Sequence, residues 1–388
     1  MIPEKDFSKH KLFPGTTGNP FDIILHRLED YEQSPLFIFI LTLIALTAIG
    51  TIFTLIHQSI SRSLILFGII LIDWNLIFWL PRAGRSFGPV KPVVLQLAIA
   101  RCAFALIPFP LWLFVLIQIM GTAAIIYGFW IEPFQLKTTH MSIKTPKLQK
   151  GSTVKILHLG DLHFERQTIR ETALLQKVKE LKPDLILFSG DILNLSCLHD
   201  EQSWQGARAI FQQLSAPLGV YLVTGSPAVD LDEIIPQLLV DLPVRLLKDE
   251  AITIPVGSDF ITLVGSFCSH HPHEDGPALE ILTQSIADKH RYRILLYHTP
   301  DLAPVAARLG YDLQLSGHTH GGQVCLPLYG ALFTGSLYGK QFESGLYQME
   351  HMTLYITRGI GLEGAGAPRV RFLCPPEIIL WEISSCHD

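Results

Sequence analysis

The chain has 388 residues, a formal net charge of -5 and a mean hydropathy of +0.33, which is high for a soluble protein. This length is enough for two ordinary domains, and the charge gives no reason to expect a nucleic-acid partner. The six cysteines are scattered and form no CxxC pair. They argue against a disulfide framework and fit a reducing compartment.

Apolar residues are concentrated in the N-terminal third of the chain. Residues 36–57 and 63–80 are each long enough to cross a bilayer as a helix. The next apolar stretch, 92–131, is too long for one helix, and Pro108 and Pro110 interrupt it. Because proline breaks helices, a tight hairpin between two further spans is the simplest interpretation. The sequence therefore predicts four membrane-spanning helices.

The same patterns divide the chain into four parts. Residues 1–34 form an N-terminal segment, 35–134 the membrane region, 135–149 a linker and 150–388 a second domain. Within the first part, residues 20–31 fit either a short amphipathic helix on the membrane surface or a plain solvated linker.

Basic residues cluster on alternating sides of the predicted spans. The clusters precede the first span, separate the second from the third and follow the fourth, whereas the other two connections carry one arginine or none. The clustered residues are Lys5, Lys9, Lys11, Arg27, Arg82, Arg85, Lys91, Lys137, Lys144, Lys147 and Lys150. Under the positive-inside rule, this pattern predicts an integral membrane protein with both termini and the second domain in the cytoplasm.

Two ionisable residues, Asp73 and Arg101, lie inside the predicted spans. Each is roughly eight or nine residues from the loop that joins their helices, so at about 1.5 Å per residue they reach similar depths. We favour an ion pair that fixes helix packing. A transport role is the alternative, since charges inside a membrane often mark a pathway.

From about residue 151, short β-rich runs alternate with helical patterns. Strand patterns occupy 153–164, 184–194 and 219–228, and helical patterns occupy 168–181 and 202–214 between them. This β-α-β-α-β order predicts an α/β domain with parallel neighbouring strands. Ligands in such domains gather beyond the carboxyl ends of the strands.

Aspartate or histidine ends four strand patterns, namely the first two above and two later ones within residues 291–300 and 313–324. These residues are Asp161 and His163, then Asp191, then His298, and finally His318 and His320. Residues i and i+2 of a strand point the same way, so each spaced pair can converge on one ligand. Turn residues explain any single strand end, but four such ends favour a metal centre of zinc, manganese or iron. Two carboxylates and four histidines exceed the needs of one tetrahedral ion, which predicts two metals bridged by a carboxylate.

These motifs, in this order, resemble those of the calcineurin-like metallophosphoesterases. The motifs are GDLH, GD, YHTPD and GHTHGGQ, and the resemblance covers roughly residues 150–384. The segment YITRGIGLEGAGAPRVRFLCPPEI is similar to the membrane-associated branch that includes bacterial phosphodiesterases and a UDP-diacylglucosamine pyrophosphatase. The resemblance implies two mixed β-sheets packed face to face with helices outside, following the multi-span membrane region.

Carried over residue by residue, the resemblance implies two divalent or transition metal ions. The ligands that it implies are Asp161, His163, Asp191 and His320 for the first ion, and Asp191, His298 and His318 for the second. Asp191 bridges the two ions, and the resemblance also assigns Asp191 and His318 to catalysis.

One motif departs from the family pattern. The family carries Gly-Asn-His followed by Asp or Glu after the third strand, where the Asn ligates the second metal and the His acts on the leaving group or transition state. Here Gly225 is followed by Ser226 and Pro227. Ser226 is left as a weak ligand of the second ion, whose site is expected to be weak or empty, and Pro227 transfers no proton.

Another segment is a candidate replacement for the missing side chains. Residues 266–276 include His270, His271, His273 and Glu274. We favour a solvated surface loop here, because histidine-rich loops are often merely exposed.

The main hypothesis is a membrane-anchored, metal-dependent phosphohydrolase that cleaves a phosphodiester or diphosphate bond, in a lipid-linked or nucleotide substrate. A phosphate leaving group needs a proton less than an alkoxide does, so the loss of the histidine favours a diphosphate. Arg358 is a candidate substrate contact, and Arg369 and Arg371 are weaker ones. The alternative is a degenerate phosphoesterase that binds a metal and a phosphorylated ligand without turnover.

Overall fold

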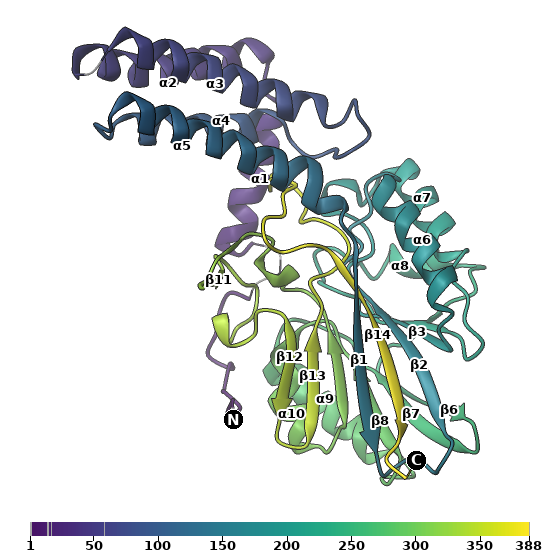
Figure 1. Cartoon of the computed structure of the whole chain (residues 1–388). Coiled ribbons are helices and arrows are strands. Elements are labelled where there is room, and N and C mark those ends of the chain that lie inside the picture. The colour runs from purple at the N-terminus through teal and green to yellow at the C-terminus, as the bar shows by residue number, and fades with distance from the viewer. Residues whose placement is uncertain (1, 14, 17, 58, 388) are drawn as a thin grey trace. The chain divides into compact units, whose positions relative to one another are not determined.

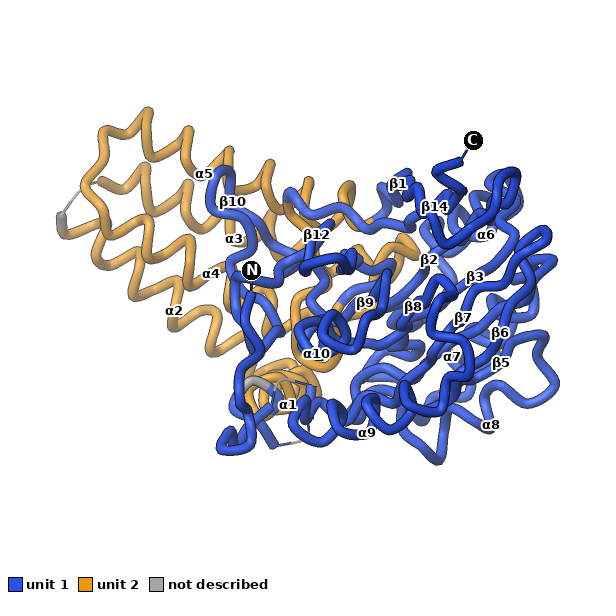
Figure 2. Tube along the Cα trace, turned by 90° about the horizontal axis from the view of Figure 1, so that it is seen from below, with its two compact units in different colours: residues 1–22, 134–362, 373–388 blue, residues 23–133, 363–372 orange. Residues whose placement is uncertain are grey.

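The computed structural model describes residues 2–13, 15–16, 18–57 and 59–387 (Figure 1). The chain forms two compact units, which Figure 2 distinguishes by colour. The α/β unit consists of Met1–Asp22, Phe134–Leu362 and Leu373–Asp388, and the helical unit consists of Ile23–Pro133 and Glu363–Phe372. The chain therefore passes between the units four times.

The helical unit contains the apolar helices predicted from the sequence. The helices of this region are α1 (Pro20–Gln33), α2 (Leu36–His57), α3 (Ile60–Trp79), α4 (Lys91–Ala105) and α5 (Leu111–Ile125), continued by a π-helical turn, Ile126–Ile131, and a 3-10 turn, Glu132–Phe134. The predicted hairpin at Pro108 and Pro110 is confirmed, because it lies between α4 and α5.

Three stretches of the described chain are long and apolar enough to cross a membrane, namely Leu36–Ile56, Ile60–Trp79 and Leu111–Phe134. Helix α4 has 15 residues. At about 1.5 Å per residue it is shorter than a bilayer core of about 30 Å. The count of four spans stays a prediction.

The predicted pair of Asp73 and Arg101 is confirmed. Arg101 Nε lies 2.8 Å from Asp73 Oδ2, and Arg101 Nη2 lies 3.1 Å from Asp73 Oδ1. The guanidinium also donates to the carbonyl of Gln118 at 2.7 Å and to Thr122 Oγ1 at 2.8 Å. A buried arginine therefore ties α3, α4 and α5 together, with more polar partners than the sequence pattern suggested.

Two six-stranded mixed sheets form the α/β unit. The first has the order β1 (Lys137–Thr145), β14 (Glu377–Ser385), β2 (Thr153–Leu159), β3 (Leu185–Phe188), β4 (Val220–Leu222) and β5 (Arg245–Leu246). The second has the order β12 (Gly345–Met349), β13 (Met352–Ile356), β9 (Leu313–Ser316), β8 (Tyr292–Leu296), β7 (Asp259–Gly265) and β6 (Glu250–Val256). The antiparallel pairs are β14 with β2, β12 with β13 and β6 with β7. Of the strands that end at the predicted site, β3, β8 and β9 are parallel to both neighbours, whereas β2 is parallel to β3 and antiparallel to β14.

The two sheets pack face to face, as the sequence predicted. A buried core lies between them and draws Ile156 and Leu187 from the first sheet and Leu263 and Ile294 from the second. Helices cover the outer faces, namely α6 (Ile169–Leu181), α7 (Glu201–Phe211) and α8 (Ile235–Leu239) on the first sheet, and α9 (Pro272–Gln284) and α10 (Ala303–Arg308) on the second. Short 3-10 turns occur at Leu195–Cys197, Pro300–Leu302, His320–Gly322 and Gly339–Gln341, and β10 (Cys325–Leu326) pairs with β11 (Gly330–Ala331).

Strand β1 lies inside the segment 135–149 that the sequence analysis treats as a linker. It pairs in parallel with β14 from Lys137 with Glu377 to Thr145 with Ser385. As the edge strand of its sheet, β1 is mostly exposed or half-buried. An edge strand with little buried surface carries no strong apolar pattern, so residues 137–145 show no clear strand signal in the sequence.

The N-terminal segment, residues 2–22, belongs to the α/β unit. Phe7 and Phe13 are buried in the core between the second sheet and its helices. Phe7 also packs edge-on against Tyr338 with ring centroids 5.4 Å apart, and the backbone N–H of Lys5 donates to the Tyr338 hydroxyl at 3.1 Å. The start of the chain is therefore part of the domain formed by its C-terminal two-thirds.

Candidate metal centre

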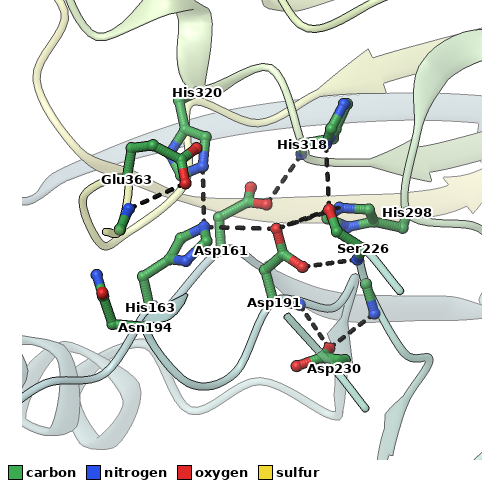
Figure 3. Close-up of polar contacts among 12 residues, drawn as sticks. Asp161, His163, Asp191, Asn194, Ser226, Asp230, His298, His318, His320 and Glu363 are labelled. Carbon is green, nitrogen blue, oxygen red and sulfur yellow. Dashed lines mark hydrogen bonds and ion pairs between the residues drawn. The ribbon is translucent and has the colours of Figure 1, made fainter. Parts of the chain in front are cut away.

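The carboxyl ends of strands from both sheets bring acidic and imidazole side chains together (Figure 3). Two groups of side chains could each hold a metal ion, because the ligand atoms within each group lie within 4.8 Å of one another. The first group is Asp161, His163, Asp191 and His320, and the second group is His270, His298 and His318. All six side chains that the strand-end pattern singled out are thus in one place.

The first group is fully buried. Nε2 of His163 lies 3.0 Å from Nε2 of His320 and 3.4 Å from Oδ2 of Asp191. Asp161 accepts the backbone N–H of His318 through Oδ1 at 2.9 Å, which joins the end of β2 to the end of β9. Its other oxygen, Oδ2, is buried without a hydrogen-bond partner among the described residues. A buried carboxylate oxygen of this kind fits a bound cation.

Asp191 also faces the second group. Its Oδ2 lies 3.3 Å from Nε2 of His298, so the same oxygen is close to imidazoles of both groups. The carbonyl of Ser189 accepts from Nδ1 of His298 at 2.8 Å, and a carbonyl is only an acceptor, so Nδ1 carries the proton. Nε2 is therefore the ring nitrogen of His298 that faces Asp191.

Ser226, which replaces the family's asparagine, lies among the ligand atoms of the second group. Its Oγ is 3.2 Å from Nε2 of His298, 3.5 Å from Nδ1 of His318 and 3.3 Å from Oδ2 of Asp191. The serine hydroxyl is therefore close enough to contribute a neutral oxygen ligand, and its role as a weak ligand stays a prediction.

His270 contradicts the interpretation of residues 266–276 as a solvated loop. Its side chain is buried, and its ring centroid lies 4.6 Å from that of His318 and 5.8 Å from that of His298. The segment leaves the end of β7 beside β8, so it runs over the site rather than into solvent. Glu274, which lies in α9, is in contrast exposed.

Unusual backbone conformations mark the same residues. Positive φ angles occur at Asp161 (49°), His163 (40°), Asp191 (60°), His270 (65°), His318 (72°) and His320 (53°). Such left-handed conformations are uncommon outside glycine and tend to cluster at functional sites. Gly225 shows how closely the backbone approaches, because a Cβ there would lie 2.1 Å from Oδ1 of Asp191.

Asp230 is a site residue that the sequence analysis missed. Its buried carboxylate accepts the backbone N–H groups of Asp191 at 2.8 Å, Ile192 at 2.9 Å and Gly225 at 2.7 Å. One side chain thus holds the turns after β3 and β4 in place. The available signal was an acidic residue five positions after the strand-end glycine.

The electrostatics favour a cation in the cluster. Burial raises the pKa of Asp161 to about 6, and the nearby Asp191 raises it further while His298 opposes the shift. Burial lowers the pKa of His298, but Asp191 and Asp161 outweigh that effect and raise the pKa to about 9. The buried carboxylates stabilise a positive charge on the neighbouring imidazole. The same carboxylates and imidazoles are the donor groups that bind divalent transition metals, which displace such protons.

The predicted substrate contact Arg358 forms an ion pair with the buried Glu377, to which its backbone N–H also donates at 3.0 Å. Its Cγ lies 2.9 Å from where a Cβ on Gly321 would be, beside His320. Arg369 and Arg371 belong to the helical unit. A phosphate contact by Arg358 stays a prediction.

The chain is similar to a known family and to several curated proteins. The family described as calcineurin-like phosphoesterase matches residues 154–322. The uncharacterized metallophosphoesterase YkuE of Bacillus subtilis is 30% identical over 269 residues, covering 67% of this chain and 90% of that protein. The phosphodiesterase YaeI of Escherichia coli is 29% identical, and the match covers 59% of this chain and 82% of that protein. The UDP-2,3-diacylglucosamine pyrophosphatase LpxG of Chlamydia muridarum is 24% identical, and the match covers 64% of this chain and 90% of that protein.

Proposed function

Since the chain belongs to the calcineurin-like metallophosphoesterase family, we propose that it is a membrane-anchored, metal-dependent hydrolase of a phosphodiester or diphosphate bond. The observation that carries this proposal is the convergence of two carboxylates and four strand-end histidines, with the carboxylate of Asp191 between the two groups. A metal-dependent phosphoesterase requires carboxylate and imidazole ligands that lie close enough together to hold its metal ions.

The side chains proposed to hold two divalent ions are Asp161, His163, Asp191 and His320 for the first and Asp191, His298 and His318 for the second, with Ser226 as a weak additional oxygen. When bound, divalent ions in such a centre lower the pKa of water and polarise phosphoryl oxygens. Burial and the nearby His298 lower the pKa of His318 to about 3. His318 therefore stays neutral at physiological pH, which keeps a ring lone pair available to a metal.

A diphosphate is the preferred substrate. The turn after β4 carries Ser226 and Pro227, so it supplies no side chain that protonates a leaving group. A phosphate leaving group depends on such a proton far less than an alkoxide. The similarity to LpxG, a pyrophosphatase of UDP-2,3-diacylglucosamine, and the apolar helices support a lipid-linked substrate.

We place the catalytic domain on the cytoplasmic side of the membrane. The N-terminal segment precedes the first apolar helix and the catalytic residues follow the last, yet both belong to the α/β unit. A chain whose two ends fold into one unit crosses the membrane an even number of times. This supports four spans, and the basic clusters favour the cytoplasmic side for both ends.

The test is hydrolysis by full-length protein purified in detergent. Bis(p-nitrophenyl) phosphate reports phosphodiester cleavage, and UDP-2,3-diacylglucosamine reports diphosphate cleavage, each with manganese, zinc or iron present. Wild-type protein should exceed Asp191→Asn and His320→Ala on at least one substrate, and the diphosphate should react faster. If wild type and both variants are equally inactive under every metal, the hydrolase proposal fails.

The competing function is a phosphoesterase-like protein that binds metal and a phosphorylated ligand without turnover. The single observation that favours it is the Ser226-Pro227 pair in place of the family's Asn-His. Metal-loaded protein that binds UDP-2,3-diacylglucosamine in equilibrium dialysis, but releases no product over hours, would support this alternative.

A further inference from the structure

Three neighbouring parallel strands of the second sheet each deliver one histidine to the site. Strand β7 leads to His270, β8 to His298 and β9 to His318. Parallel strands that lie side by side end at the same edge, so these imidazoles converge for a topological reason. The end of β7 lies close to the segment that follows β4, since a Cβ on Gly265 would lie 3.1 Å from Cγ1 of Val223, and that segment carries Ser226 in place of the family's asparagine.

His270 shares the properties of the predicted ligands. It is 4% exposed, and its ligand nitrogen lies within 4.8 Å of those of His298 and His318. Its φ of 65° falls in the same left-handed region as the angles of Asp161 and His318. The four described histidines with positive φ all belong to the two groups, so the backbone around His270 is shaped like that of the other ligands.

A buried carboxylate fixes the turn that carries His270. Asp275 accepts from the backbone N–H of Ser269 at 3.0 Å and from its hydroxyl at 2.6 Å. The same carboxylate accepts from the hydroxyl of Tyr297 at 2.5 Å, and Tyr297 directly precedes His298. Asp275 thereby ties the backbone beside His270 to the side chain of the residue that precedes His298, much as outer partners hold metal ligands in place.

The N-terminal segment closes the other side of the His270 ring. Gly15 adopts a φ of +76°, and a Cβ there would lie 2.4 Å from Cε1 of His270. The ring of Phe13 packs against His271 with centroids 4.3 Å apart. Only glycine fits at position 15, because a Cβ there would clash with the His270 ring. The close approach of this backbone keeps the ring of His270 beside His298 and His318.

We infer that His270 replaces the family's asparagine as a ligand of the second metal ion. This inference rests on the metal centre of the proposed function and changes its composition. Three imidazoles and the shared carboxylate of Asp191 surround the second position, where the family pattern has two imidazoles, the carboxylate and an amide oxygen. An imidazole-rich set selects zinc, cobalt or iron over magnesium and manganese.

The experiment counts ions bound to full-length protein in detergent. Metal-free protein is dialysed against a fixed concentration of free Zn²⁺, and zinc per chain is measured by elemental analysis. Wild type should bind two ions and His270→Ala one, with the affinity for the second ion reduced beyond the roughly 10- to 100-fold typical of losing an outer partner. The matched control is His273→Ala, since His273 lies in the same segment but in neither group, and it should bind two.

Two further variants separate ligand loss from misfolding. His270→Phe keeps an aromatic ring against Gly15 but has no ring nitrogen, and it should also bind one ion. Ser226→Asn in the His270→Ala background supplies the family's amide oxygen and should restore the second ion. With Co²⁺ in place of Zn²⁺, the visible absorption of the second site should be lost in His270→Ala and regained in the double variant.

Two zinc ions in both His270→Ala and His270→Phe would overturn the inference, and so would a single ion in wild type. Because ions are counted without substrate, the result is independent of turnover. Two ions in wild type and one in the variants, in a protein that hydrolyses nothing, would leave this inference standing while rejecting the hydrolase.

Discussion

The carboxylate of Asp230 accepts the backbone N–H of Asp191 at 2.8 Å. Asp191 is the residue that faces both ligand groups, and Asp230 supports it through the backbone. Because Asp230 also accepts from Ile192 and Gly225, a single buried acid aligns the ends of two neighbouring strands. The position of the Asp191 carboxylate therefore depends on a residue outside both groups.

Replacing Asp230 with alanine should destabilise the protein and weaken metal binding. Three buried N–H groups lose their acceptor, and each unsatisfied group costs about 1–3 kcal/mol. We expect a clearly lower thermal unfolding midpoint in detergent and fewer than two zinc ions per chain. Asp232→Ala is the control, since Asp232 makes only an exposed ion pair with Lys248. If Asp230→Ala has the stability and zinc content of wild type, the turns after β3 and β4 keep their conformation without this carboxylate.

Removing the metal should abolish hydrolysis reversibly. Dialysis against a chelator should reduce turnover to the level without enzyme, and adding back zinc or manganese should restore it in wild type. Asp191→Asn should stay at least roughly 100-fold below wild type after metal is restored, because Asp191 is the ligand proposed to be shared by both positions. Asp288→Asn, at a surface ion pair, should recover fully. Turnover that survives complete chelation would disprove metal dependence.

His158 should contribute to acid sensitivity. It is fully buried on β2 beside Ser189, with Nε2 and the serine Oγ 3.1 Å apart, and burial lowers its pKa from 6.5 to about 3. Above pH 6.5 the side chain is neutral in both the folded and the unfolded chain. As the pH falls from 6.5 toward 3, the unfolded chain binds a proton that the folded chain does not, so the folded state loses stability.

The measurement is the fall in unfolding midpoint between pH 7 and pH 4.5, made on metal-free protein. This fall should be smaller in His158→Gln than in wild type. His351→Gln removes an exposed histidine and should behave like wild type. An unchanged pH dependence in His158→Gln would mean that His158 is not a source of the acid sensitivity.

The ion pair of Asp73 and Arg101 should act on stability. Both side chains are buried, so removing one partner leaves an uncompensated charge at a cost of roughly 3–5 kcal/mol. Arg101→Met alone should therefore lower the unfolding midpoint and the protein level more than Arg101→Met combined with Asp73→Leu. If Arg101→Met keeps its stability while a transport activity disappears, the charged pair has a role in transport.

The sequence pattern singled out the six strand-end side chains that converge in the structure, but it favoured a solvated loop for the segment that carries His270. These six candidate ligands could be predicted because each Asp or His directly follows a strand pattern, and that order is visible in the local sequence. The local sequence of a histidine-rich segment does not indicate whether the segment is solvated or buried. Its burial depends on β7 lying beside β8 and on Gly15 from the other end of the chain, and no local pattern contains those relationships.

Other misses have similar causes. Strand β1 was hidden because its edge position leaves most of its side chains in contact with solvent. Asp230 was hidden because it acts by accepting backbone N–H groups, which every residue except proline possesses. The apolar helices and the Pro108–Pro110 hairpin were predictable because bilayer length and proline geometry are local properties.

The segment Glu363–Phe372 interrupts the α/β unit and packs with the helical unit. A Cβ on Gly366 would lie 2.4 Å from the carbonyl oxygen of Leu25, and the backbone N–H of Arg371 donates to the carbonyl of Gly128 at 3.0 Å. A soluble fragment cut after Pro133 would thus lack the partners of this segment and would also lose Phe7 and Phe13 from its core. Truncating the chain to a stand-alone enzyme should yield an insoluble or proteolysed product, and biochemical work on this protein requires detergent or lipid from the start.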